Sequence, residues 1–181
     1  KKTLLPDKSN YNNIFNKYIE NINNNKYNKI VLSRIHEITL DSKLNYFDIF
    51  KNMDNKCSNF LFTLNRDEKI LGSSPEKIIH LTNKKFMTEA IAGTYPKTKD
   101  DVKQNLLNNK KELSEHNFVI KHLVKILKKY SSDIKLSKSR ILELSHLFHI
   151  QTPIKGTLKN NTHILNLLYN LYPTPAVAGY P

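Results

Sequence analysis

Cysteine and long apolar runs are scarce in this sequence. Its 181 residues include one cysteine, Cys57, which excludes an internal disulfide and the paired cysteine ligands of a structural zinc site. No run of about 18 apolar residues could form a transmembrane helix, and the first residues lack the apolar stretch of a secretory signal. We therefore expect a cytoplasmic chain without membrane contact. With 39% apolar residues, it can bury one hydrophobic core.

Arginine is also scarce, which affects how the basic composition is interpreted. The formal net charge is +13, a value that suits nucleic-acid binding. Only Arg34, Arg66 and Arg140 are arginines, however, and the remaining basic residues are lysines spread along an asparagine-rich chain. Arginine makes the forked contacts to phosphates and bases, so we expect compositional drift and no nucleic-acid partner. An anionic small molecule would still be attracted.

The hydrophobic pattern predicts an α+β fold in a single domain over 1–181. Helical periodicity predicts helices over these ranges: 9–24, 46–53, 100–130 and 162–172. Composition and length predict strands over these ranges: 29–40, 60–64, 69–73, 76–81, 84–91 and 140–150. The four strands between 60 and 91 are spaced like an antiparallel meander. Because no regular βαβ repeat appears, α+β is favoured over α/β.

Glycine is rare as well, and its placement marks unusual segments. Three of the four glycines, Gly72, Gly93 and Gly179, fall in segments that stand out from the drifted background. In a chain so poor in glycine, each marks a backbone position that tolerates little else. The segments are KIVLSR at 29–34, GSSPEK at 72–77, AIAGTYPK at 90–97, KKELSEH at 110–116 and LYPTPAVAGYP at 171–181.

Polar residues in or near these segments could carry chemistry, but each also has an ordinary explanation. Lys29 suits a solvated strand edge, and Glu76 suits a surface turn. Glu115 and the glutamate three residues before it share a helical face, which suits either solvation or a cation site. His149 suits a hydrogen-bonded core histidine, and Thr174 between two prolines suits a turn. The residues alone predict an α+β domain and do not assign a function to its polar groups.

Six motifs in order, however, resemble those of a known family. KIVLSR, LGSSPEK, EAIAGTYPK, KKELSEH, HIQTPIKGTL and LYPTPAVAGYP are similar to segments of the chorismate-binding enzymes, which include isochorismate, salicylate, anthranilate and aminodeoxychorismate synthases. The resemblance runs from about Tyr11 to Pro181. It implies the fold of anthranilate synthase component I, with antiparallel sheets flanked by helices, and chorismate as the substrate.

The family resemblance also favours one reaction. Members that form isochorismate or salicylate carry a lysine at the position of Lys29, which implies an isochorismate synthase, an isomerase, with salicylate synthase as the alternative. PTPAV at 173–177 differs from anthranilate synthases. Ala92 occupies the place of a covalent lysine found in some aminodeoxychorismate synthases, and Lys155 matches a different part of the fold. A non-enzymatic module that binds polyanions is the alternative from another class.

The resemblance implies a role for each candidate residue. Lys29 would be the base that activates water, and Glu76 the acid that protonates the leaving hydroxyl, on opposite sides of the substrate ring. Burial would lower the pKa of the lysine and raise that of the glutamate. Glu115 would be a ligand of Mg²⁺. The expected substrate-binding residues are Gly93, Thr94, His149 and Thr174.

Family members continue beyond the PTPAVAGYP motif. That continuation supplies a second metal ligand and the groups that hold the carboxylates of the substrate. We therefore expect a catalytic domain without its C-terminal third, inactive alone and with strand edges and apolar surface exposed. The intact motifs favour a piece of a longer product over a decayed gene. Tyr95, Lys97 and Tyr172, where arginine, arginine and histidine are usual, fit drift. Menaquinone or siderophore synthesis would consume the product.

Overall fold

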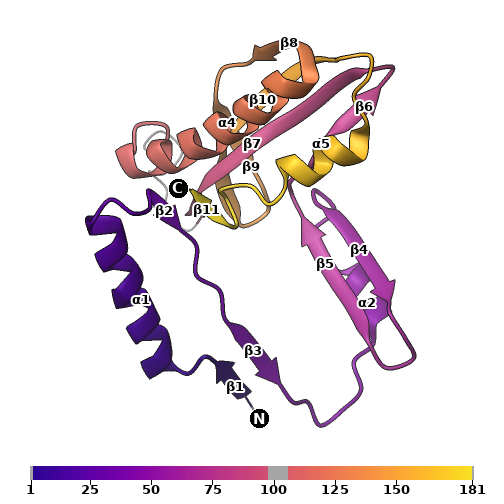
Figure 1. Cartoon of the computed structure of the whole chain (residues 1–181). Helices are drawn as coiled ribbons and strands as arrows, with labels where there is room; N and C mark the ends of the chain where they lie inside the picture. The colour runs from indigo at the N-terminus through magenta and orange to yellow at the C-terminus, as the bar shows by residue number, and fades with distance from the viewer. Residues whose placement is uncertain (1, 98–105, 181) are drawn as a thin grey trace. The chain divides into compact units, whose positions relative to one another are not determined.

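The computed structural model describes residues 2–97 and 106–180 (Figure 1). These residues form two compact units. Unit 1 comprises Lys1–Asn45 and Val177–Pro181, and unit 2 comprises Tyr46–Ala176. The expected single domain over 1–181 stays a prediction. Within the described ranges, no helix is long and apolar enough to cross a membrane.

Unit 1 combines a helix with short strands. Its elements are β1 (Lys2–Leu5), α1 (Lys8–Asn23), β2 (Lys29–Ile30), β3 (Ile35–Ile38) and β11 (Gly179–Tyr180). Helix α1 begins after Asp7, whose side chain accepts a hydrogen bond from the backbone N–H of Asn10 at 2.9 Å, which satisfies a donor of the first turn. Strand β1 pairs with β3, and β2 pairs with β11, both antiparallel. The strand predicted over 29–40 forms as two pieces because its ends have different partners.

Unit 2 contains two antiparallel sheets and the helices that accompany them. Its elements are α2 (Tyr46–Lys51), β4 (Ser58–Thr63), β5 (Lys69–Ser74), β6 (His80–Thr82), β7 (Lys85–Pro96), α4 (Lys110–Tyr130), β8 (Ser131–Leu136), β9 (Arg140–Glu143), β10 (Leu147–Leu158) and α5 (Ile164–Leu171). The larger sheet has the order β6-β7-β10-β8, and β9 also pairs with β10. The smaller sheet is the β4–β5 hairpin.

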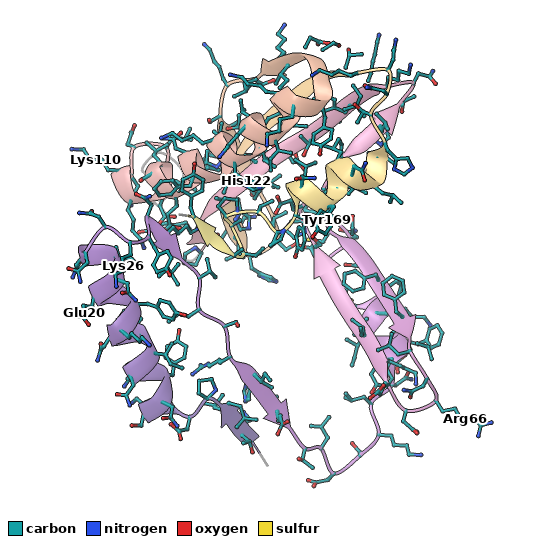
Figure 2. The ribbon with its side chains drawn as sticks, in the orientation of Figure 1. Glu20, Lys26, Arg66, Lys110, His122 and Tyr169 are labelled. Atoms are coloured by element: carbon teal, nitrogen blue, oxygen red, sulfur yellow. The ribbon has the colours of Figure 1, made fainter. Side chains whose placement is uncertain are left out.

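The core of unit 2 lies between α4, α5 and the larger sheet. Alternate residues of β7 face one side of the sheet, and a stripe at helical spacing on α4 packs against them. His122 of α4 also reaches α5, where its Nε2 lies 3.3 Å from the carbonyl oxygen of Leu171 (Figure 2). The buried cluster consists of Phe86, Ala90, Ala92, Val119, Leu123, Leu127, Ile154, Leu158, Leu167 and Leu171.

The structure corrects the predicted meander. Strands β4 and β5 pair only with each other among the described strands, while β6 and β7 belong to the larger sheet. Residues 76–79 are not in a strand, because the chain passes there from one sheet to the other. Strand β7 runs on to Pro96, since β10 supplies partners along its whole length. The α+β class and the antiparallel pairing are confirmed.

Other element predictions were right in type and less accurate in extent. The helix predicted over 100–130 forms at Lys110–Tyr130, and 98–105 lies outside the described residues. The strand predicted over 140–150 forms as β9 and the first part of β10. The remainder of β10 contains Pro153 and Gly156, which argue against a strand in the sequence.

Candidate active site

A β-bulge shapes the AGT segment near the end of β7. Thr94 pairs with His149 of β10, but the next residue, Ile150, pairs with Ala92, so Gly93 is an extra residue on β7. Gly93 has φ +79°, and a Cβ there would lie 3.0 Å from Cδ1 of Ile150. The left-handed backbone and the tight contact both favour glycine. A bulge re-aims the side chains that follow it, and here it sets the position of Thr94.

Thr94 and His149 form a polar pair across β7 and β10. Oγ1 of Thr94 lies 3.0 Å from Nδ1 of His149. Burial lowers the pKa of His149, and the backbone of Gly93 opposes that shift in part. The imidazole is therefore neutral near pH 7. A neutral imidazole can donate one hydrogen bond and accept another, so this pair can bind a polar group of a ligand.

Glutamates of α4 lie beside the bulge. The backbone N–H of Thr94 donates a hydrogen bond to Oε2 of Glu112 at 3.3 Å. Glu115 follows one turn later, and Nζ of Lys111 lies 3.9 Å from Oε1 of both glutamates. The side chain of Glu112 is 13% exposed and that of Glu115 is 34% exposed. The sequence left the role of Glu112 open, and the structure connects it to the AGT segment.

Glu76 lies in the loop after β5 and is half-buried. Its backbone carbonyl accepts a hydrogen bond from Oγ of Ser74 at 3.2 Å. Nearby, Oγ1 of Thr88 donates to the carbonyl of Ile78 at 2.6 Å, which attaches the loop to β7. Burial, followed by the negative charge of Glu89, raises the pKa of Glu76 to about 7. This is the direction that a proton donor needs near neutrality.

Glu89 belongs to a hydrogen-bonded series that the sequence did not suggest. Its Oε2 accepts a hydrogen bond from Nε2 of Gln151, and Oε1 of Gln151 accepts one from Nε of Arg140 at 2.7 Å. A cavity of about 250 Å³ is lined by Glu89 and Gln151 together with Pro75 and Lys77, the two neighbours of Glu76. The alternation along β7 could have placed Glu89 on the face opposite Thr88 and Ala90. Its partner from β10 could not be predicted.

Lys29 lies in unit 1, where it is half-buried at the start of β2. It pairs with Tyr180. Gly179 beside it has φ +101°, and a Cβ at that position would lie only 2.6 Å from the carbonyl oxygen of Lys29. A cavity of about 420 Å³ is lined by Lys29 with Tyr18, Tyr27 and Tyr180. Since Lys29 and Glu76 belong to different units, their placement on opposite sides of a substrate stays a prediction.

Thr174 is buried, with 8% of its surface exposed, and lies in unit 2 between Pro173 and Pro175. Its expected contact with a substrate stays a prediction.

Lys155, expected to have no catalytic role, is exposed on β10 opposite Met87.

Comparison with known proteins identifies the family. A family model described as "Chorismate binding enzyme" matches residues 1–181. The chain belongs to the chorismate-binding enzymes. The order of motifs along the sequence predicted this family, and the prediction is confirmed.

The relatives of this chorismate-binding enzyme include isochorismate synthases. It is 29% identical to isochorismate synthase EntC of Escherichia coli K12 over 162 residues, which is 84% of this chain and 41% of EntC. It is 28% identical to isochorismate synthase MenF of Bacillus subtilis over 168 residues, which is 88% of this chain and 36% of MenF. The chain thus spans about two fifths of the length of these curated relatives.

Solved structures share the fold. The chain superimposes with a TM-score of 0.89 and 29% identity on DhbC of Bacillus anthracis, described as a 2,3-dihydroxybenzoate-specific isochorismate synthase, covering 100% of this chain and 52% of DhbC. It superimposes on anthranilate synthase component I of Streptococcus pneumoniae with a TM-score of 0.83 and 20% identity, covering 99% of this chain and 41% of the other. The predicted fold of the chorismate-binding enzymes is therefore confirmed.

Proposed function

We propose that this chorismate-binding enzyme is the isochorismate-forming type and converts chorismate to isochorismate. The observation that carries the proposal is the half-buried position of Glu76 in the SSPEK loop, where the family resemblance implies the acid and where burial raises its pKa to about 7. The similarity to the isochorismate synthases EntC and MenF supports it.

The reaction adds water at one ring carbon of chorismate while a hydroxyl leaves from another and the double bonds shift. Lys29 removes a proton from the attacking water, and Glu76 transfers its proton to the departing hydroxyl, which leaves as water. With a pKa of about 7, roughly half of the Glu76 side chains hold that proton at neutral pH. Proton gain at the lysine and proton loss at the glutamate balance within one turnover.

Substrate contacts are proposed for the residues around the bulge. Thr94 and neutral His149 offer a hydroxyl and an imidazole to polar groups of chorismate. Gly93, without a side chain, leaves its backbone open to a close approach. Thr174 completes the proposed set.

The α4 glutamates fit a divalent cation. Oε1 of Glu112 and Oε1 of Glu115 lie at the same distance, 3.9 Å, from the ammonium of Lys111, so both carboxylates already face one positive charge. Among the described residues, no group of three or more His, Cys, Asp or Glu side chains gathers. Mg²⁺ is commonly held by one or two carboxylates with water and substrate oxygens, which these residues can accommodate. We propose Glu115 as its ligand with Glu112 in support, and the ion would neutralise the ring carboxylate of chorismate.

Product analysis tests this function. The full-length natural protein that contains residues 1–181 is incubated with chorismate and Mg²⁺, and the reaction products are separated by chromatography. We expect isochorismate alone, and Lys29→Ala to lower kcat by at least about 100-fold because a general base is lost. Lys26→Ala, an exposed lysine three residues earlier, is the matched control and should retain activity.

Other outcomes separate the alternatives. Salicylate with pyruvate would transfer the assignment to salicylate synthase. Salt-sensitive polyanion binding without conversion would favour the basic module. The expectations that residues 1–181 alone are inactive, and that menaquinone or siderophore synthesis uses the product, stay predictions.

A further inference from the structure

Strand β7 contributes a second carboxylate, that of Glu89, to the region around Glu76, and the proposed reaction assigns it no role. Glu89 is half-buried and acts on Glu76 through its charge. Pro75 and Lys77, on either side of Glu76, line the same cavity as Glu89. Two carboxyl groups in one partly buried region repel each other when both are ionised, so the position of Glu89 affects how readily Glu76 loses its proton.

Hydrogen bonds through Gln151 fix the position of Glu89. Arg140 can only donate hydrogen bonds, so its Nε orients the amide oxygen of Gln151 toward itself, at 2.7 Å. The amide NH₂ of Gln151 is then directed at Oε2 of Glu89. The series Arg140, Gln151, Glu89 therefore holds the carboxyl group of Glu89 in one position.

Basic side chains border the same cavity. Lys56, Lys77 and His80 line it together with Glu89, and a positive charge near a carboxyl group favours its ionisation. The causes that raise the pKa of Glu76 are burial and then the charge of Glu89.

We propose that Glu89, held in place by Gln151 and Arg140, is a positioning residue that keeps the proton on Glu76 until the leaving hydroxyl takes it. In that step the O–H bond of Glu76 breaks and an O–H bond of the departing water forms, which leaves Glu76 as a carboxylate that regains its proton from solvent. The role of Glu89 in the reaction rests on the proposed function. Its electrostatic effect on Glu76 concerns these two residues alone and does not depend on that function.

A titration of the Glu76 carboxyl group tests the proposal without any assay of turnover. The full chain is labelled with ¹³C at glutamate carboxyl carbons, and Glu76→Gln identifies the Glu76 signal in NMR spectra. The wild-type midpoint is expected near pH 7. Glu89→Gln keeps an acceptor for Gln151 but removes the charge, so it should lower the midpoint by roughly half a pH unit or more.

Two further variants separate charge from structure. Glu89→Asp retains the negative charge and should keep the midpoint above that of Glu89→Gln. Glu20→Gln, which removes an exposed carboxylate of α1 (Figure 2), should leave the midpoint unchanged. An unchanged midpoint in a folded Glu89→Gln variant, or equal midpoints in the two Glu89 variants, would overturn the proposal.

In the active protein, the same variant should alter the pH dependence of kcat. The alkaline limb, where Glu76 loses its proton, should move to lower pH in Glu89→Gln, while KM for chorismate stays within about twofold, since Glu89 is not proposed to touch the substrate. An unmoved limb would count against the role of Glu89. Absence of wild-type turnover would instead refute the proposed function and leave the titration result standing.

Discussion

Glu76 is half-buried in the loop after β5, and its pKa of about 7 compares with 4.5 for an unperturbed glutamate. Between these pH values the unfolded chain releases a proton that the folded chain retains. The contribution of Glu76 to the free energy of unfolding is therefore fully present below pH 4.5. It is lost as the pH rises toward 7, by at most about 1.4 kcal/mol per pH unit. Above pH 7 the fold must hold a half-buried charge, so suitability for proton donation reduces stability.

Glu76→Gln should therefore stabilise the chain, and more so in alkaline solution. At pH 8 the glutamine avoids the buried charge, and we expect a higher free energy of unfolding than in the wild type. At pH 4.5 the two proteins should differ little, because the wild-type carboxyl group is neutral. Urea denaturation at both pH values measures this, with Glu20→Gln as the control. An equal difference at both pH values would show that the buried charge is not the cause.

At the scale of secondary-structure elements, a buried hydrogen-bonded series joins α4 to β10. His116 of α4 is 1% exposed, and its Nε2 lies 2.7 Å from Oγ1 of Thr152 on β10. Thr152 in turn lies 2.7 Å from Oγ of Ser139. Burial lowers the pKa of His116 to about 4, so its ring is neutral near pH 7. This series fixes α4, and with it Glu112 and Glu115, against the larger sheet.

Thr152→Val should therefore lower the free energy of unfolding by about 1–3 kcal/mol, because a buried ring nitrogen loses its partner. Ser139→Ala removes only the exposed end of the series and should lower it by less than about 1 kcal/mol. Thermal or urea denaturation of both variants at pH 7 provides the comparison. Similar losses in the two variants would mean that the His116 contact contributes little.

The type of most elements could be predicted from the sequence, but their partners could not. The stripe on α4 and the alternation on β7 follow from local spacing, and the bulge glycine was marked by its rarity. The pairing of β7 with β10 joins residues about 60 positions apart, and no local pattern encodes it. For that reason the sequence does not indicate Glu89, whose importance depends on Gln151, whereas the SSPEK motif indicates Glu76.

At the scale of the whole molecule, the two units differ in how much they bury. Among the described residues, the fully buried ones all belong to unit 2, and α1 has none. Large apolar side chains are exposed in both units, including Ile35 at 61% in unit 1 and Phe62 at 59% in unit 2. Local opening is easiest where few apolar groups are buried.

Hydrogen exchange should therefore distinguish the helices α1 and α4. We expect amides of 8–23 to exchange at least about tenfold faster than those of 110–130 at pH 7, because opening α1 exposes less apolar surface. Mass spectrometry of peptic peptides measures both segments in one sample of the chain. Equal protection of the two helices would show that unit 1 is held by contacts stronger than its burial indicates.

The bulge at Gly93 also limits how this gene can change. The chain carries many lysines and asparagines, and exchanges among exposed polar side chains leave the backbone path intact. Gain of one codon between Gly93 and Thr94 would be different, because the added residue would lie opposite His149 and turn Thr94 and every later side chain of β7 to the opposite face. Drift in composition is thus compatible with this site, while an added residue is not.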